Sequence, residues 1–318
     1  MGHSAAVWSD RASLELTEDS NGIKHALLRS PRGASARVSL YGGHVVSWKN
    51  NRGEELLFTS SKAALNNHPK TMRGGISICF PQVGNSGLLE QQGFARNKNW
   101  TIEENPPPLH PKDSLGKSFV DLLLRSSEED IKCWPNCFEF RLRVSLSVDG
   151  NLVLISRIRN INGKPFSFSF AYHTYLSVSD ISEVRIEGLE TLEYLDNLCG
   201  RECFTEQCDA ITFESEVDRV YLNSPKYIAV LDHERKRTYV LRKDGLPDVV
   251  VWNPWEKKSK TMADIGDDGY KHMVCVDGAA IEKNITLKQG EEWTGRMELV
   301  AVPSSFCTDP LDPRLKFL

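Results

Sequence analysis

The sequence predicts an all-β fold in which large antiparallel sheets pack against each other as a sandwich. Apolar and polar residues alternate with a period of two along much of the chain, most clearly over 141–148. Asp149-Gly150-Asn151 supplies a turn, and the run 152–158 then returns, as in a β-hairpin. No segment of 12 or more residues carries a sustained helical stripe. Many short strands separated by turns indicate a sandwich with few and short helices.

The strand pattern continues in order along the chain. The runs with strand character are 35–40, 141–148, 152–158, 166–173, 227–232, 238–242, 249–252, 273–277 and 293–302. Short helical turns are expected only at 62–66 and 267–271. Because no internal repeat or domain boundary is evident, we expect one domain over 1–318 with its core at about 38–302.

Composition excludes several classes of partner. The 39 basic and 43 acidic residues give a net charge of -4, too near neutral and of the wrong sign for a nucleic-acid binder. The N-terminus has no apolar run long enough for a signal peptide, and no run is long enough to span a membrane. We therefore expect a cytoplasmic protein, a monomer, with neither nucleic acid nor membrane as a partner. The basic residues that gather near Arg73 and Arg96 suit a small anion.

The eight cysteines do not form a metal-binding pattern. Cys133 and Cys137 have C-x3-C spacing, and Cys199, Cys203 and Cys208 have C-x3-C-x4-C spacing. Structural zinc sites usually combine C-x2-C-type pairs with further cysteine or histidine ligands. In a cytoplasmic chain of this size, free thiols are expected and no metal is predicted.

Two arginines stand beside glycine-containing turns. Arg73 precedes Gly74-Gly75, and Arg96 follows Gly93 by three positions, 23 residues along the chain from Arg73. Paired glycines allow a tight turn or a close approach of the backbone to a ligand. The two guanidinium groups are either solvated at the surface or arranged around one phosphate, which guanidinium binds in a bidentate manner.

His173 ends a segment with two unlike faces. One face carries Phe166, Phe168, Phe170 and Tyr172, and the other carries Ser167, Ser169, Ala171 and His173. The aromatic face belongs in a core, whereas the small polar face leaves room for a ligand beside the imidazole. His173 is therefore a candidate proton donor or acceptor, or else a structural histidine at the end of a strand.

Two carboxylates complete the set of candidates. Asp277 follows the apolar run 273–276 and is either a base in a pocket or the first residue of a turn with Gly278. Asp218, and Trp252 with Trp255, offer hydroxyl-binding and sugar-stacking groups that are equally compatible with structural roles. No glycine-rich nucleotide-binding pattern is present, so no nucleotide cofactor is expected.

Together these segments resemble the aldose 1-epimerase superfamily, specifically its glucose-6-phosphate 1-epimerase branch. The segments that carry the resemblance are Arg73-Gly74-Gly75, Phe80-Pro81-Gln82 with Gly84, Gly93-Phe94-Ala95-Arg96, His173-Thr174-Tyr175, Val217-Asp218, Trp252-Asn253-Pro254-Trp255 and Met273-Val274-Cys275-Val276-Asp277. They occur in the family's order, and the resemblance extends from about Val38 to about Val300.

The resemblance implies a β-supersandwich with the sugar in a cleft over one sheet. It implies that Arg73 and Arg96 hold a phosphate, with Gln91 beside them, and that Asp218 binds sugar hydroxyls. It also implies that His173 is the acid that acts on the ring oxygen. These roles are expectations from the family, carried to the matching positions of this chain.

The chain departs from the family pattern at two positions. The family's base is a glutamate, and here that position is Asp277, which is one methylene shorter. The reach of the carboxylate changes by about 1.5 Å, which matters in proton transfer. Glu282, on the following segment, is the alternative base. Gln92 stands where relatives often carry histidine, which affects a secondary contact.

The function implied is that of a cofactor-free isomerase of carbohydrate metabolism. It would interconvert the α and β anomers of a hexose 6-phosphate such as glucose 6-phosphate, with His173 as acid and Asp277 as base. One alternative is an aldose 1-epimerase acting on neutral sugars, which would not need Arg73 and Arg96. The other is a catalytically silent protein that binds a sugar phosphate, favoured by the aspartate at 277.

Overall fold

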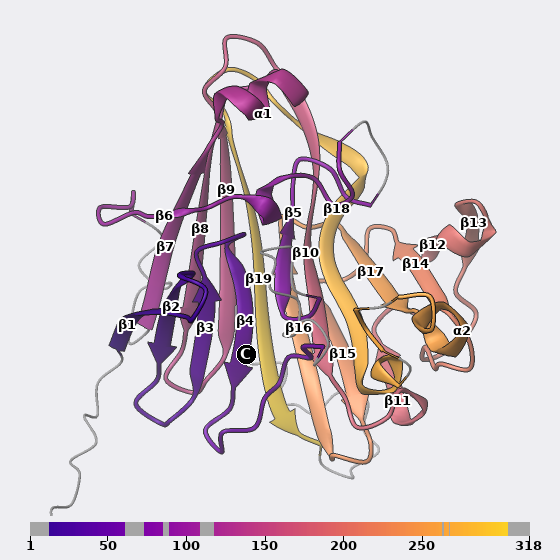
Figure 1. Cartoon of the computed structure of the whole chain (residues 1–318). Helices are drawn as coiled ribbons and strands as arrows, with labels where there is room; N and C mark the ends of the chain where they lie inside the picture. The colour runs from indigo at the N-terminus through magenta and orange to yellow at the C-terminus, as the bar shows by residue number, and fades with distance from the viewer. Residues whose placement is uncertain are drawn as a thin grey trace, which may run out of the picture.

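The computed structural model describes residues 13–60, 73–84, 89–108, 118–262, 264–266 and 268–304. These residues form an 11-stranded and an 8-stranded antiparallel sheet that lie face to face (Figure 1). The predicted all-β class is confirmed. The predicted helical turn at 62–66 lies outside the described residues.

The larger sheet contains the central strands that carry the candidate residues. In spatial order it comprises β1 (Ser13–Glu18), β2 (Lys24–Arg29), β3 (Ser35–Ser39), β4 (His44–Lys49), β5 (Ile76–Cys79), β10 (Phe166–Ser177), β18 (Met273–Leu287), β17 (Asp248–Asn253), β14 (Val217–Tyr221), β12 (Glu193–Asp196) and β13 (Glu202–Thr205). The smaller sheet comprises β11 (Val184–Glu187), β15 (Tyr227–Asp232), β16 (Arg237–Asp244), β19 (Glu292–Pro303), β9 (Leu152–Asn160), β8 (Phe138–Leu146), β7 (Ser118–Arg125) and β6 (Thr101–Ile102).

Every run that was predicted as a strand is a strand. The largest difference in length is at β18, which continues ten residues beyond the predicted end of 273–277. Strands such as β5 and β14 were not predicted because they are short and do not alternate clearly. Two short helices were also not predicted, α1 (Glu128–Cys133) and α2 (Trp255–Ser259). The turn predicted at 267–271 corresponds to a 3-10 helix at Gly269–His272.

The core lies between the two sheets. Phe168, Phe170 and Tyr172 of β10 are almost completely buried, and they pack in one cluster with Phe140 and Leu142 of β8. The prediction that the aromatic face of β10 belongs to the core is confirmed. Because side chains alternate along a strand, the odd-numbered residues of this part of β10 point away from the smaller sheet. That outer face of the central strands is where the candidate site lies.

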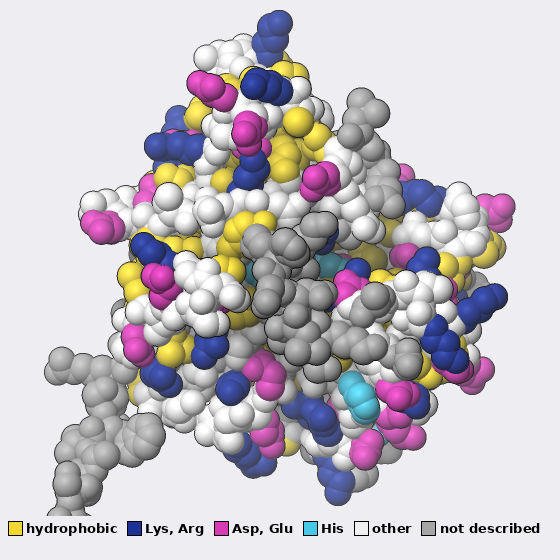
Figure 2. All heavy atoms as spheres, viewed as in Figure 1, with side chains coloured by type: hydrophobic (Ala, Val, Ile, Leu, Met, Phe, Trp, Pro, Cys, Tyr) yellow, Lys and Arg dark blue, Asp and Glu magenta, His cyan; other side chains and the backbone are white. Residues whose placement is uncertain are grey.

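Charged side chains of both signs are interspersed over the face of the molecule in Figure 2. No extended patch of one sign is visible on that face, in keeping with the small net charge. Among the residues described, no helix is both long and apolar enough to cross a membrane.

Candidate active site

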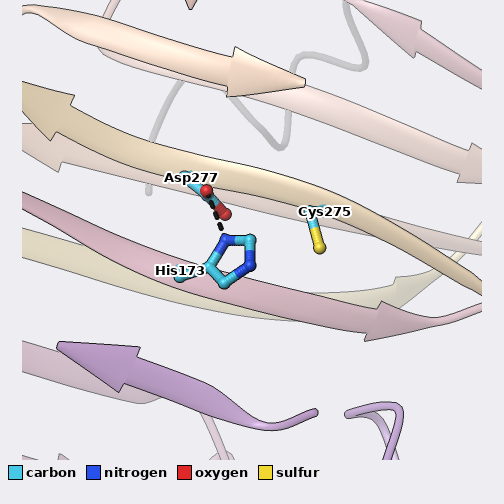
Figure 3. A group of neighbouring side chains, drawn as sticks. All are labelled: His173, Cys275 and Asp277. Carbon is cyan, nitrogen blue, oxygen red and sulfur yellow. Dashed lines mark hydrogen bonds and ion pairs between the residues drawn. The ribbon is translucent and has the colours of Figure 1, made fainter. Parts of the chain in front are cut away.

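Strand register brings His173 and Asp277 together from segments 104 residues apart. Ala171 pairs with Ala279, and Tyr175 pairs with Cys275, so His173 of β10 lies opposite Asp277 of β18. Nδ1 of His173 is 2.7 Å from Oδ2 of Asp277 (Figure 3). The His173 side chain keeps 15% of its surface exposed and that of Asp277 keeps 5%. The pair is therefore partly open to a ligand.

Asp277 is held at both carboxylate oxygens. Its Oδ1 accepts a hydrogen bond of 2.8 Å from the backbone N–H of Thr174, and its Oδ2 faces His173. The residue lies inside β18, so the interpretation of Asp277 as the start of a turn is wrong. Because β10 supplies both partners, the carboxylate has a fixed orientation beside the imidazole.

Nε2, the second imidazole nitrogen of His173, is connected to Arg73 through the hydroxyl of Tyr175. Nε2 of His173 is 3.0 Å from the hydroxyl of Tyr175, and Nη1 of Arg73 donates to that hydroxyl at 3.2 Å. Nε of Arg73 in turn donates to Oδ2 of Asp264 at 2.6 Å. A continuous chain of hydrogen bonds thus runs from Asp264 to Asp277.

The two glycines after Arg73 shape the backbone bend from which its side chain extends. Gly74 and Gly75 have φ angles of 129° and 66°. A Cβ on Gly75 would collide with the carbonyl oxygen of Val45 and lie 2.9 Å from Nε2 of His44. His44 is buried and its Nε2 donates to the carbonyl of Gly74 at 2.7 Å. The paired glycines thus allow a close approach of this segment to the backbone of Phe58 and Val45, and the buried His44 holds it in place.

Arg96 lies in a 3-10 turn, Ala95–Asn97, that packs against Gly42. Its Nε atom is buried and makes no hydrogen bond within the described part of the chain. Burial is the main reason that the pKa of His44 falls to about 4, and the charges of Arg96 and His173 also lower it. Arg96 and His173 therefore both lie near His44. Arg96 is thus only partly solvated, with donor capacity left for an anion.

Asp218 and Trp252 extend the site across the sheet. Asp218 of β14 pairs with Trp252 of β17, which pairs with Cys275 of β18, which pairs with Tyr175 of β10. The Trp252 ring lies 6.0 Å from the imidazole of His173. Burial raises the pKa of Asp218, whose Oδ1 accepts a 2.7 Å hydrogen bond from the amide of Asn197.

One expected residue, Glu282, does not join this group. Glu282 lies five residues beyond Asp277 on β18, about 16 Å along an extended strand, and faces Arg201 at 3.9 Å. Gln91 is exposed, whereas its neighbour Gln92 accepts a 3.0 Å hydrogen bond from the backbone N–H of Gly84. Gln92 adopts a positive φ of 67°, and its hydrogen bond with Gly84 stabilises the loop before Arg96. The side chain of Gln92, which stands where relatives often carry histidine, thus bonds to its own loop.

One group of side chains has the composition of a metal site. The donor atoms of His173, Cys275 and Asp277 lie within 4.8 Å of one another (Figure 3). Burial raises the pKa of Cys275 well above its usual value, which keeps it a neutral thiol. Nδ1 of His173 already shares a hydrogen bond with Asp277. This arrangement fits a proton-transferring pair better than a set of metal ligands.

Comparison with known proteins places the chain in a family. A family model described as aldose 1-epimerase matches residues 24–300. The chain belongs to the aldose 1-epimerase family. The sequence-based resemblance is thereby confirmed, and the match begins 14 residues earlier than the 38 expected.

Relatives of this family carry related names. A protein of Cenchrus ciliaris, provisionally named glucose-6-phosphate 1-epimerase, is 61% identical over 94% of this chain and 91% of its own length. A protein of Escherichia coli K12 with the same provisional name is 32% identical over 77% of this chain and 79% of its own. The crystal structure of a provisionally named mutarotase of Salmonella typhimurium superposes with a TM-score of 0.77 at 25% identity, covering 91% of this chain and 97% of the other.

The structure adds residues that sequence reasoning did not assign to the site. Tyr175 follows His173 by two positions, and this spacing alone places both on one face of a strand. Asp264 is 191 residues from Arg73 in sequence, and Asn197 lies in a turn before β13. No local pattern identifies these two, because their roles arise from contacts between distant segments.

Proposed function

We propose that the protein interconverts the α and β anomers of a hexose 6-phosphate, with glucose 6-phosphate as the substrate to test first. The observation that carries the proposal is the contact of His173 with Asp277 on the open face of the central strands, joined to Arg73 through Tyr175. The family match and the names of the relatives support the same reaction.

Anomer exchange needs a base for the O1 hydroxyl and an acid for the ring oxygen. In the proposal, His173 gives a proton from Nε2 to the ring oxygen while Asp277 accepts the proton of O1. The C1–O bond of the ring opens to an aldehyde, the C1–C2 bond rotates, and the ring closes on the other face as both proton transfers reverse. The pair regains its starting protonation after each cycle, and each positioned group contributes about 10²–10⁴-fold.

The remaining side chains have complementary roles. We assign the phosphate to Arg73 and Arg96, with Gln91 at the exposed rim, because guanidinium groups bind phosphate through paired hydrogen bonds. The unpartnered Nε of Arg96 supports this assignment. We assign the sugar hydroxyls to Asp218. An enzyme for neutral aldoses would have no use for the two arginines.

The test is magnetisation-exchange NMR on equilibrated glucose 6-phosphate, with and without the purified protein. We expect faster transfer between the α and β anomers with the protein, and loss of the acceleration in the His173→Asn variant. His233→Asn, at an exposed turn, is the control and should match the wild type. Exchange at the buffer rate with wild-type protein, or full activity of His173→Asn, would contradict the proposal.

A second candidate function is binding without catalysis. Asp277, which replaces the family's glutamate, favours this alternative because its shorter carboxylate is engaged by His173 and Thr174. Calorimetry separates the two functions. A protein that binds glucose 6-phosphate and leaves the exchange rate unchanged is a binding protein.

We also infer a cytoplasmic location and a monomeric state. The seven cysteines within the described residues are all free, as is usual in a reducing compartment. Hexose phosphates are charged metabolites that would be met there. Cell fractionation and light scattering test the two points separately, and recovery in a secreted fraction or at twice the mass would contradict them.

A further inference from the structure

Tyr175 lies between His173, the proposed acid, and Arg73, one of the two residues proposed to bind the phosphate. Its side chain is almost completely buried, and its hydroxyl lies 3.0 Å from Nε2 of His173 and 3.2 Å from Nη1 of Arg73. Burial raises the pKa of Tyr175, so the hydroxyl keeps its proton. A protonated hydroxyl can donate one hydrogen bond and accept others.

These bonds have a defined direction. Arg73 can only donate, so the phenol oxygen accepts at that side, which leaves its O–H group to donate to Nε2 of a neutral His173. When the imidazole carries two protons, Nε2 donates to the same oxygen. In either state the hydroxyl covers Nε2. Because Nδ1 faces Asp277, Nε2 is the nitrogen that must reach the sugar.

Arg73 is the residue through which a bound phosphate can weaken the contact of Tyr175 with Nε2 of His173. Asp264 holds its Nε, and Tyr175 is the weaker, uncharged acceptor of its Nη1. A phosphate dianion accepts more strongly than a phenol and competes for the same guanidinium. A neutral sugar offers no such competitor, so with a neutral sugar the contact of Arg73 with Tyr175 persists.

We propose that Tyr175 is a specificity-determining positioning residue that couples phosphate binding at Arg73 to exposure of Nε2 of His173. The proposal rests on the proposed function. When phosphate binds, the guanidinium of Arg73 leaves the phenol of Tyr175, and the hydrogen bond of that phenol with Nε2 of His173 weakens. The ring oxygen of the sugar then takes the place of the phenol at Nε2. The phosphate group then contributes to the rate as well as to binding.

The experiment measures anomer exchange of neutral glucose with and without inorganic phosphate. In the wild type, inorganic phosphate should stimulate exchange of glucose. In Tyr175→Phe the stimulation should vanish, and the ratio of kcat/KM for glucose 6-phosphate over glucose should fall by about 2- to 12-fold, the worth of one neutral hydrogen bond. Stimulation and ratio both unchanged in Tyr175→Phe would overturn the proposal.

A matched control lies three residues away in the same strand. Tyr172 is also buried, but it faces the core, where its hydroxyl donates to the carbonyl of Gly295 and shares a hydrogen bond with the hydroxyl of Ser156. Tyr172→Phe removes the same hydroxyl from the opposite face and should keep the phosphate stimulation. Loss of stimulation in both variants would indicate a general structural effect and overturn the assignment to Tyr175.

A measurement on the unaltered protein covers the case in which Tyr175→Phe does not fold. In the 15N spectrum of the imidazole groups, inorganic phosphate should move the Nε2 resonance of His173, assigned by its absence in His173→Asn. An unmoved resonance at saturating phosphate overturns the coupling. The two proposals fail differently: no acceleration of glucose 6-phosphate exchange removes the function, whereas acceleration without coupling removes only the role of Tyr175.

Discussion

Replacing Asp277 with asparagine tests the proton-transferring pair directly. The carboxylate accepts hydrogen bonds of 2.7 Å from His173 and 2.8 Å from the N–H of Thr174. Asparagine has one acceptor oxygen, which can keep only one of these bonds. If the oxygen stays with Thr174, the NH2 group faces Nδ1 and forces that nitrogen to accept. His173 then adopts the other tautomer, with its proton on Nε2, and the base is lost.

The expected loss follows from these contacts. Removing a positioned base costs about 10²–10⁴-fold in rate, which corresponds to about 3–5 kcal/mol. Asp277 also orients the imidazole through a hydrogen bond between charged and polar groups, and losing it costs about 1.5–3 kcal/mol. The two losses overlap in part, so they are not added. We therefore expect kcat for glucose 6-phosphate to fall at least about 100-fold in Asp277→Asn.

The assay is magnetisation-exchange NMR at saturating glucose 6-phosphate, with the imidazole tautomer of His173 read from its 15N shifts. Asp232→Asn is the control, since Asp232 is a buried carboxylate of the smaller sheet that accepts hydrogen bonds from Ser179 and Arg235. Its variant should lose stability and keep the exchange rate. If Asp277→Asn stays within about threefold of the wild type, the carboxylate is not the base and the reasoning is wrong.

Other predictions follow from the neighbouring groups. Arg96→Ala should lower kcat/KM for glucose 6-phosphate about 10- to 150-fold and leave glucose unchanged, which rate comparison on both sugars checks. Gly75→Ala should cost at least about 2 kcal/mol of unfolding free energy in urea, because a Cβ there meets Val45 at positive φ. The pKa of His44 is about 4 when folded, below its usual 6.5, so the unfolded chain binds more protons between these values. Stability should therefore fall by up to about 3 kcal/mol as pH drops from 6.5 to 4, and less in His44→Gln; a flat wild-type profile would contradict this.

The strands that could be predicted are those with a local cause. Over 166–173 the alternation of aromatic and small residues is visible in the sequence, and burying one face of a strand produces that period. Strands such as β5 and β14 were not predicted. Each lies between two other strands, and the burial of a central strand depends on these neighbours as well as on its own residues. Their four and five residues carry too little pattern to separate them from a loop.

The sequence by itself determined the all-β class, the identity of His173 and Asp277 as candidates, and the backbone freedom beside Arg73. Each depends on local chemistry: side-chain alternation, titratable groups and backbone freedom. The contact between His173 and Asp277, the chain of bonds through Tyr175 to Asp264, and the separation of Glu282 were decided only by the tertiary structure. Strand register sets these distances, and register depends on the packing of whole sheets.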